Sequence, residues 1–226
     1  MAKMDEFREE REAMKNAPLK DRIAYFWEYN KLETFLVVFG TICIISIATS
    51  IMNRKEEVLS GVVLNRFWLQ QEGLGCEEFI NDYLEYREYD PDEYDLVLNT
   101  AMTYIAGDTE GVLEENVNSS QVIAASLTAG ALDFMIADDA AILEFDNTEY
   151  FHDLRNIFTE DELKSYDDFL IYSGRDDSIP VAIDITNSEC VSEIYAVQHD
   201  TLGIALFGNA SHVDEFKYFV EYIVEN

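Results

Sequence analysis

The stretch Gln121–Asp139, QVIAASLTAGALDFMIADD, contains the elements that decide the fold. Its alanine-rich first part predicts a helix over 114–129, and Gly130 is suited to the left-handed residue that ends a helix. The apolar run LDFMIA then predicts a buried strand. Asp138 and Asp139 follow, and acids are favourable at the positive N-terminal end of the next helix. Helix, strand and helix therefore succeed one another within 26 residues.

The same alternation continues on both sides of this stretch. Short valine- and isoleucine-rich runs predict further strands, and apolar residues spaced three and four apart predict further helices. The expected strands cover 58–65, 94–100, 179–186 and 202–207, and the expected helices cover 76–84, 148–169, a segment starting at 187 or 188, and 213–223. Alternating strands and helices predict an α/β domain with one mainly parallel sheet and helices on both faces.

The N-terminal quarter of the chain has a different character. Thr34–Met52, TFLVVFGTICIISIATSIM, is 19 residues long without a charge. At about 1.5 Å per residue such a helix spans a hydrocarbon core of roughly 30 Å. The first 33 residues carry 7 Lys and Arg, which favours a cytoplasmic N-terminus. We therefore expect a cytoplasmic tail with an amphipathic helix over 1–33, a transmembrane helix over 34–52 and an extracellular α/β domain over 57–226.

A cleaved signal peptide is the alternative interpretation of the apolar run. Ala48-Thr49-Ser50 resembles a small-residue cleavage site. The preceding 33 residues are long for a signal peptide and carry both charge signs, which favours a retained anchor in the cell membrane.

The charge of the domain is strongly negative. From Glu56 onward the chain has 38 Asp and Glu against 6 Lys and Arg, a net charge of −32. Such a surface repels nucleic acid and anionic lipid, and it attracts cations, cationic ligands and basic proteins. Solubility in an ion-rich exterior explains the same charge without a ligand.

Several phrases of the domain resemble extracellular solute-binding proteins of the type II periplasmic class. They are QVIAASLTAGALDFMIADD, YFHDLRNIF, IPVAIDIT, LGIALFGNASHVDEF and FKYFVEYIVEN. The segment LKDRIAYFWEYNKLETFLVVFG is similar to small membrane-anchored proteins of Gram-positive bacteria. The resemblance implies a reduced, anchored form with the fold of one lobe. The family closes two lobes over a ligand, and about 170 residues hold one lobe with a helical insert, so no substrate is implied.

No catalytic motif is present, and we expect neither an enzyme nor an obligatory cofactor. The sequence lacks GxSxG, P-loop and HExxH patterns, and its 3 histidines are scattered. Ligands of open α/β sheets bind beyond the carboxyl ends of the strands. The candidate ligand-binding residues at those ends are Asn65, Asn99, Thr100, Asp138, Asp139, Asp184 and Thr186.

Three further groups have two interpretations each. Asp90, Asp92, Glu93 and Asp95 offer oxygen ligands for Ca²⁺, or they form the turn that ends a helix. Cys76 and Cys190 form one disulfide in an exported domain, or they are separate buried thiols. The tyrosines 83, 86, 89 and 94 with Trp68 offer stacking faces for a sugar or peptide, or they pack in the core.

These observations lead to two expected functions. The first is a membrane-anchored extracellular binding module that recognises a small solute, a peptide or a cationic ligand. The alternative is a cell-surface interaction or scaffold protein that docks a partner protein on its acidic domain.

Overall fold

The computed structural model describes residues 18–52, 54–65, 76–107, 113–194 and 201–226. The chain divides into two compact units, Met1–Arg54 and Lys55–Asn226. Predictions that concern residues 1–17 and Trp68 lie outside the described residues.

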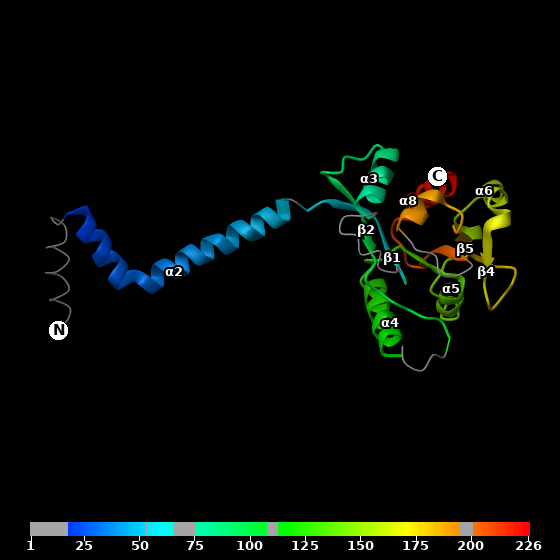
Figure 1. Ribbon diagram of the computed structural model, residues 1–226, viewed down its shortest axis with the longest axis horizontal. Helices are drawn as coiled ribbons and strands as arrows, with labels where there is room; N and C mark the ends of the chain where they lie inside the picture. Colours follow the sequence, from blue (N-terminus) through cyan, green and yellow to red (C-terminus); the bar gives the residue numbers. More distant parts are fainter. Residues whose placement is uncertain (1–17, 53, 66–75, 108–112, 195–200) are drawn as a thin grey trace. The chain divides into compact units, whose positions relative to one another are not determined.

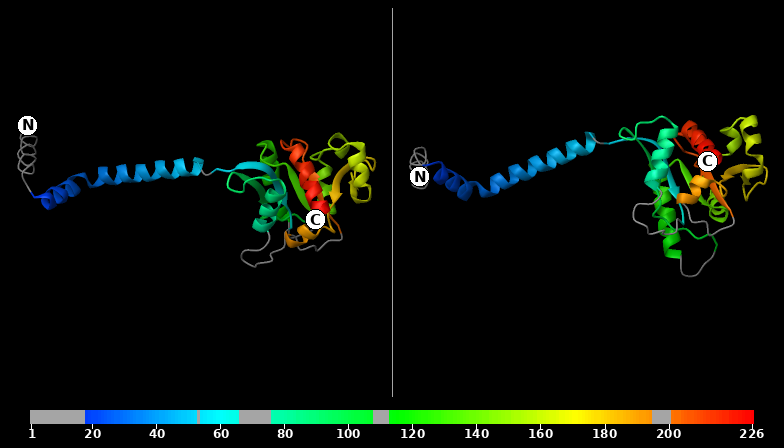
Figure 2. Two further views of the ribbon diagram at one scale, coloured as in Figure 1. Left: turned by 90° about the horizontal axis from the view of Figure 1, so that it is seen from above. Right: turned by 45° about the horizontal axis from the view of Figure 1, so that its top comes forward.

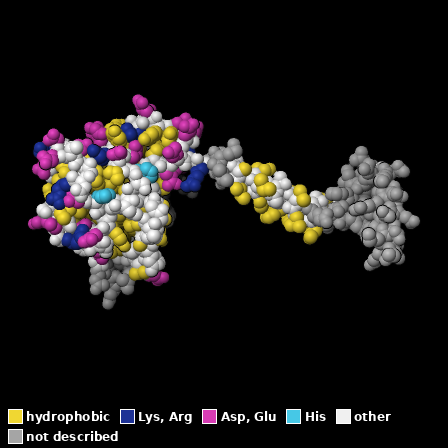
Figure 3. All heavy atoms as spheres, turned by 180° about the vertical axis from the view of Figure 1, so that it is seen from behind, with side chains coloured by type: hydrophobic (Ala, Val, Ile, Leu, Met, Phe, Trp, Pro, Cys, Tyr) yellow, Lys and Arg dark blue, Asp and Glu magenta, His cyan; other side chains and the backbone are white. Residues whose placement is uncertain are grey.

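The first unit contains helix α2, Leu19–Met52. The helix includes the whole uncharged stretch Thr34–Met52. Its described large apolar side chains are exposed, and hydrophobic side chains cover the surface of the helix in Figure 3. Phe35 and Ile44, for example, have exposed fractions of 66% and 69%. The hydroxyl of Thr41 donates to the carbonyl oxygen of Val37 at 2.8 Å, so this polar group is satisfied within the helix. Among the residues described, no helix is both long enough and apolar enough to cross a membrane.

The second unit is an α/β domain around a six-stranded sheet (Figure 1). The strands are β1 (Glu56–Val63), β2 (Tyr94–Asn99), β3 (Phe134–Asp138), β4 (Leu170–Tyr172), β5 (Pro180–Asp184) and β6 (Leu202–Leu206). Their order in the sheet is β2-β1-β3-β6-β5-β4. The five predicted strands are present within two residues of their expected bounds, and β4 is additional.

The sheet is mixed, and the prediction of a mainly parallel sheet was wrong. β1 pairs in parallel with β2 and β3, whereas β6 pairs antiparallel with both β3 and β5, and β4 pairs antiparallel with β5. A strand that is buried on both faces has a continuous apolar sequence whether it pairs parallel or antiparallel with its neighbours. The runs of β5 and β6 therefore identify strands without giving their orientation.

Helices cover both faces of the sheet, as predicted (Figures 1 and 2). The helices are α3 (Cys76–Tyr86), α4 (Leu113–Thr128), α5 (Asp139–Asp146), α6 (Glu160–Ser165), α7 (Glu189–Ile194) and α8 (Val213–Glu225). Side chains of α3, α7 and α8 meet one face of the sheet in a core that includes Phe79, Phe134 and Phe219. Side chains of α4 and α5 meet the other face in a second core that includes Ile123 and Ile142.

The two signals in the deciding stretch are confirmed. Gly130 has a left-handed φ of +65° just after α4, and Asp138 is the N-cap of α5. The expected long helix over 148–169 is instead divided. It consists of the 3₁₀ helices η1 (Leu154–Asn156) and η2 (Asp167–Phe169) with α6 between them.

Candidate functional site

The carboxyl ends of β1, β3 and β5 lie at the same edge of the sheet, and there the structure brings two predicted ligand residues together. The side-chain amide of Asn65 donates to Oδ2 of Asp138 at 3.1 Å and also to the carbonyl oxygen of Tyr104. Its Oδ1 accepts from the backbone N–H of Tyr104 at 2.7 Å. Asn65 therefore pairs with the backbone of Tyr104 as a neighbouring strand would.

This pairing uses the polar atoms that the sequence analysis assigned to a ligand. Asp138 is 3% exposed, and its Oδ1 accepts from the N–H of Ala141 at 2.9 Å as the cap of α5. The backbone N–H of Asn65 donates to the carbonyl oxygen of Met102 at 3.1 Å. Asn65 and Asp138 thus fasten the segment 101–107 across the end of β1, and their observed contacts are structural.

The other predicted residues are held locally. Oδ1 of Asn99 accepts from the N–H of Ala101 at 3.1 Å, which makes a turn. Oδ1 of Asp184 accepts from the N–H of Thr186 at 2.9 Å, and Oγ1 of Thr186 accepts from the N–H of Leu202 at 2.8 Å, which fastens the end of β5 to β6. Thr100 and Asp139 are half-buried, and the backbone N–H of Asp139 donates to Thr201 at 3.3 Å.

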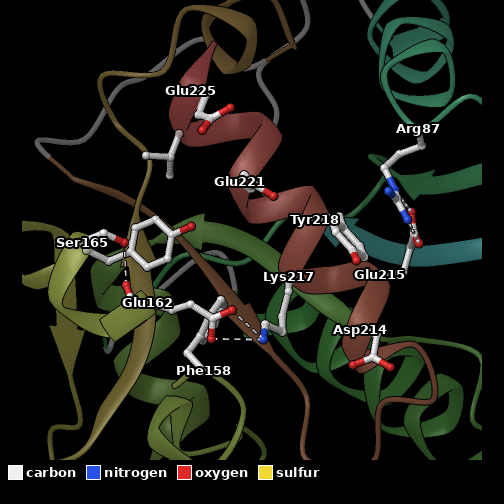
Figure 4. Close-up of a pocket in the computed structure, with 12 residues that line it drawn as sticks. Arg87, Phe158, Glu162, Ser165, Asp214, Glu215, Lys217, Tyr218, Glu221 and Glu225 are labelled. Atoms are coloured by element: carbon white, nitrogen blue, oxygen red, sulfur yellow. Dashed lines mark hydrogen bonds and ion pairs between the residues drawn. The ribbon is translucent and has the colours of Figure 1, made fainter. Parts of the chain in front are cut away.

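Two adjoining hollows lie on the face of the domain that carries α8, and Figure 4 shows the larger of them. It has a volume of about 860 Å³ and lies between α8, the region around α6 and the turn after α3. A second hollow of about 480 Å³ shares Val224 and Glu225 with it and extends to Asp184. We call the two together the α8 groove. The larger hollow is lined by Arg87, Phe158, Glu162, Ser165, Tyr166, Asp214, Glu215, Lys217, Tyr218, Glu221, Val224 and Glu225.

One end of the α8 groove holds an arginine in a site made of a carboxylate and an aromatic ring. Nε and Nη2 of Arg87 donate to the two carboxylate oxygens of Glu215 at 3.0 and 3.1 Å. The guanidinium lies 3.7 Å from the ring centroid of Tyr218, within cation–π range. Tyr83 and Tyr89 donate to the same carboxylate at 2.6 and 3.1 Å. Burial alone would raise the pKa of Glu215, but these donors hold it below its usual value.

A lysine occupies a second site of the same composition. Nζ of Lys217 lies 2.8 Å from Oε1 of Glu162 and 5.6 Å from the ring centroid of Phe158. Glu162 also accepts from the N–H of Thr159 at 2.6 Å in a capping box that begins α6. The hydrogen bond from Lys217 and the one from Thr159 lower the pKa of Glu162 to about 2.

Three carboxylates of the larger hollow have no basic partner among the described residues. Asp214, Glu221 and Glu225 line the larger hollow, and within the described part of the chain none of them has a hydrogen bond or ion pair to a basic side chain. The lining therefore has five carboxylates against two cations, both of which are already paired. Asp and Glu side chains also gather around the periphery of the face shown in Figure 3. The described lining of the larger hollow therefore presents carboxylates without basic partners and no unpaired basic group.

The remaining predicted features have structural roles in the described residues. Oδ1 of Asp90 accepts from the N–H of Asp92 at 2.9 Å in the turn after α3. No group of three or more His, Cys, Asp or Glu side chains among the residues searched is arranged to hold a metal ion, so the Ca²⁺ interpretation of Asp90, Asp92 and Asp95 gains no support. Cys76 and Cys190 are half-buried and border one core, and the structure has no disulfide between them, so the disulfide interpretation is not realised.

The tyrosines chosen from sequence are mainly packing residues. Tyr83 is fully buried, and the rings of Tyr89 and Tyr94 contact each other with centroids 4.9 Å apart. Tyr86 is 42% exposed and contacts Tyr222 at 5.2 Å. Sequence reasoning missed the α8 groove, because its residues come from three distant segments. The one available signal was the excess of acids on α8, where Asp214, Glu221 and Glu225 face the hollow.

Comparison with known proteins leaves the site to be interpreted by its own chemistry. A fold alone does not determine a function, and a function must be argued from the residues of a site. No family model, no curated protein and no solved structure matches this chain.

Proposed function

We propose that the chain is a membrane-anchored, non-catalytic binding module that takes a cationic ligand in the α8 groove of its extracellular domain. The observation that carries the proposal is the lining of that groove, where carboxylates without basic partners among the described residues stand beside aromatic rings. Aromatic faces and carboxylates together attract organic cations, because both the ring quadrupole and the charge favour a positive group.

The size of the groove fits this role. Ligand sites are concave and have volumes of about 300–1,000 Å³, and the larger hollow has about 860 Å³. Its two own cations show that the lining stabilises positive groups in defined positions, since Arg87 and Lys217 are each held by a carboxylate and a ring.

The anchor rests on the uncharged run Thr34–Met52 and on the excess of Lys and Arg before it. Helix α2 runs through this whole stretch with its described large apolar side chains exposed, although the described residues by themselves contain no helix long and apolar enough to cross a membrane. Carbonate washing of membranes from expressing cells tests it. We expect the full chain to stay with the membrane and a variant without residues 34–52 to be released, and release of both would refute the anchor.

The cationic ligand is tested by the thermal stability of the full chain in a neutral detergent. A ligand that binds the folded state raises the melting temperature. We expect spermine and an oligolysine to raise it above the value in NaCl of equal ionic strength, while an oligoglutamate leaves it unchanged. No rise with either cation beyond that of NaCl would refute the proposal.

Docking of a partner protein is the second candidate, and one observation favours it. The two hollows share Val224 and Glu225, so the groove continues along α8 toward the end of β5. A groove of this length accommodates an extended chain better than a compact solute.

A further inference from the structure

Glu221 and Glu225 are the two carboxylates of the α8 groove that a bound cation would stabilise most. They lie one turn apart near the C-terminus of α8 (Figure 4). Like charges four residues apart destabilise a helix, and carboxylates are unfavourable at the negative C-terminal end of the helix dipole. The last turn of α8 has no basic residue to offset either effect. A bound cation would relieve both.

Two aromatic rings stand beside these carboxylates. Tyr166 lines the hollow with them, and Tyr86 is partly exposed at the end of α3. The ring of Tyr86 contacts that of Tyr222, which follows Glu221 in α8, with centroids 5.2 Å apart. Burial raises the pKa of both tyrosines, and the negative charges of Glu221 and Glu225 raise it further. We call Tyr86, Tyr166, Glu221 and Glu225 the open seat.

The open seat has the composition of the two seats that are filled. Arg87 occupies a seat formed by Glu215 and Tyr218, and Lys217 occupies one formed by Glu162 and Phe158. In both, the occupant is a basic side chain of a protein. Within the described residues the open seat has carboxylates and rings without such an occupant.

The spacing of the carboxylates fits an extended peptide. Four residues of helix separate Glu221 and Glu225, a rise of about 6 Å. Alternate side chains of an extended chain point the same way at intervals of about 6.7 Å. Two basic residues separated by one residue therefore match the two carboxylates.

We infer that the open seat docks a lysine- or arginine-bearing extended segment of a partner protein, which inserts alternate basic side chains between Glu221, Glu225 and the tyrosine rings. This inference rests on the proposed cation-binding function and names its ligand. Charge complementarity selects the partner, because the acidic groove repels an acidic segment and lacks a free cation for a phosphate or carboxylate.

Fluorescence anisotropy of a labelled peptide of alternating lysine and serine tests the inference. The protein is the full chain in neutral detergent at about 0.15 M salt, where long-range attraction is screened beyond about 8 Å. The test variant is E221Q/E225Q. The matched control is E114Q/E115Q, which removes the same charge from two exposed residues of α4, on the opposite face of the sheet.

We expect E221Q/E225Q to weaken peptide binding about tenfold, as the loss of two exposed ion pairs implies, and the control to change it less than about twofold. Spermine should compete more weakly than the peptide, because its amines lie on one narrow chain and it has no peptide backbone to add contacts along the groove. Equal weakening by both variants would overturn the open seat while leaving cation binding intact. Spermine binding as tightly, with the same sensitivity to E221Q/E225Q, would overturn the peptide as occupant. Absence of binding by any cation would refute the proposed function as well.

Discussion

Replacement of Glu215 by alanine is the sharpest test of the cluster at the end of the α8 groove. The Glu215 carboxylate accepts two hydrogen bonds from Arg87 and one each from Tyr83 and Tyr89. The side chains of Arg87 and Glu215 are only 23% and 12% exposed. Glu215→Ala leaves the guanidinium without its carboxylate and the hydroxyl of the buried Tyr83 without its closest acceptor.

The expected loss of stability follows from these contacts. Removal of one partner from a buried ion pair costs about 3–5 kcal/mol. Because Arg87 keeps some contact with water, we expect the lower end, about 3 kcal/mol. For a domain of about 170 residues, each kcal/mol shifts the melting temperature by about 2–4 °C. The variant should therefore melt about 6–12 °C below the wild type.

Thermal unfolding followed by near-ultraviolet circular dichroism measures this shift, since that signal reports the packing of the tyrosines. The control is Asp161→Ala. Asp161 pairs with Lys164 on the surface, and its side chain is 95% exposed. Exposed pairs contribute little, so the control should melt within about 1 °C of the wild type. A fall of less than about 2 °C for Glu215→Ala would refute the structural importance of the cluster.

Three further predictions use the same domain. The folded-state pKa of Glu215 is lowered, so its carboxylate stabilises the fold above the unfolded pKa of about 4.3 and loses this effect as the pH falls through the folded pKa. Urea unfolding should therefore show that the difference in unfolding free energy between wild type and Glu215→Gln narrows below about pH 4.3. A difference that stays constant with pH contradicts this prediction. Gly61→Ala should lower the unfolding free energy of the domain by about 2 kcal/mol, because an added Cβ would lie 2.2 Å from the ring of Phe134. The control Gly174→Ala has no neighbour closer than 4.0 Å to the added Cβ, and its urea unfolding should match that of the wild type. NaCl should raise the melting temperature by screening the net charge of −32 that the domain carries from Glu56 onward. CaCl₂ at equal ionic strength should raise it further only if Asp90–Asp95 bind Ca²⁺. A melting temperature independent of NaCl would show that charge repulsion within the domain is unimportant.

The sequence predicted most local elements because their signals are local. The continuous apolar run of β1, the glycine after α4 and the acid before α5 each act within a few residues, and each is found where expected. β4 was missed because three residues, Leu170–Tyr172, are too few to form a pattern. The expected helix over 148–169 was broken by tertiary pairing, in which Phe151 forms an isolated bridge with Phe207.

The candidate site was harder to predict than the elements. The rule that ligands bind at strand ends selected Asn65 and Asp138 correctly as neighbours, but it could not show that the backbone of Tyr104 takes the amide of Asn65. The α8 groove depends on the approach of α6 to α8, shown by the pair Glu162–Lys217, which are 55 residues apart in sequence. Contacts of this kind have no signature in a short stretch of sequence.

The central place of β6 has a consequence for the order in which the domain can be completed. β3 and β5 are not paired with each other, and among the described strands β6 alone joins the half-sheet β2-β1-β3 to the pair β5-β4. β6 is the last strand in the sequence, so until residues 202–206 are in place each part has one strand edge with unpaired backbone groups. Open edges of this kind recruit other chains. A chain truncated before residue 202 would therefore keep both edges open, and we expect it to aggregate.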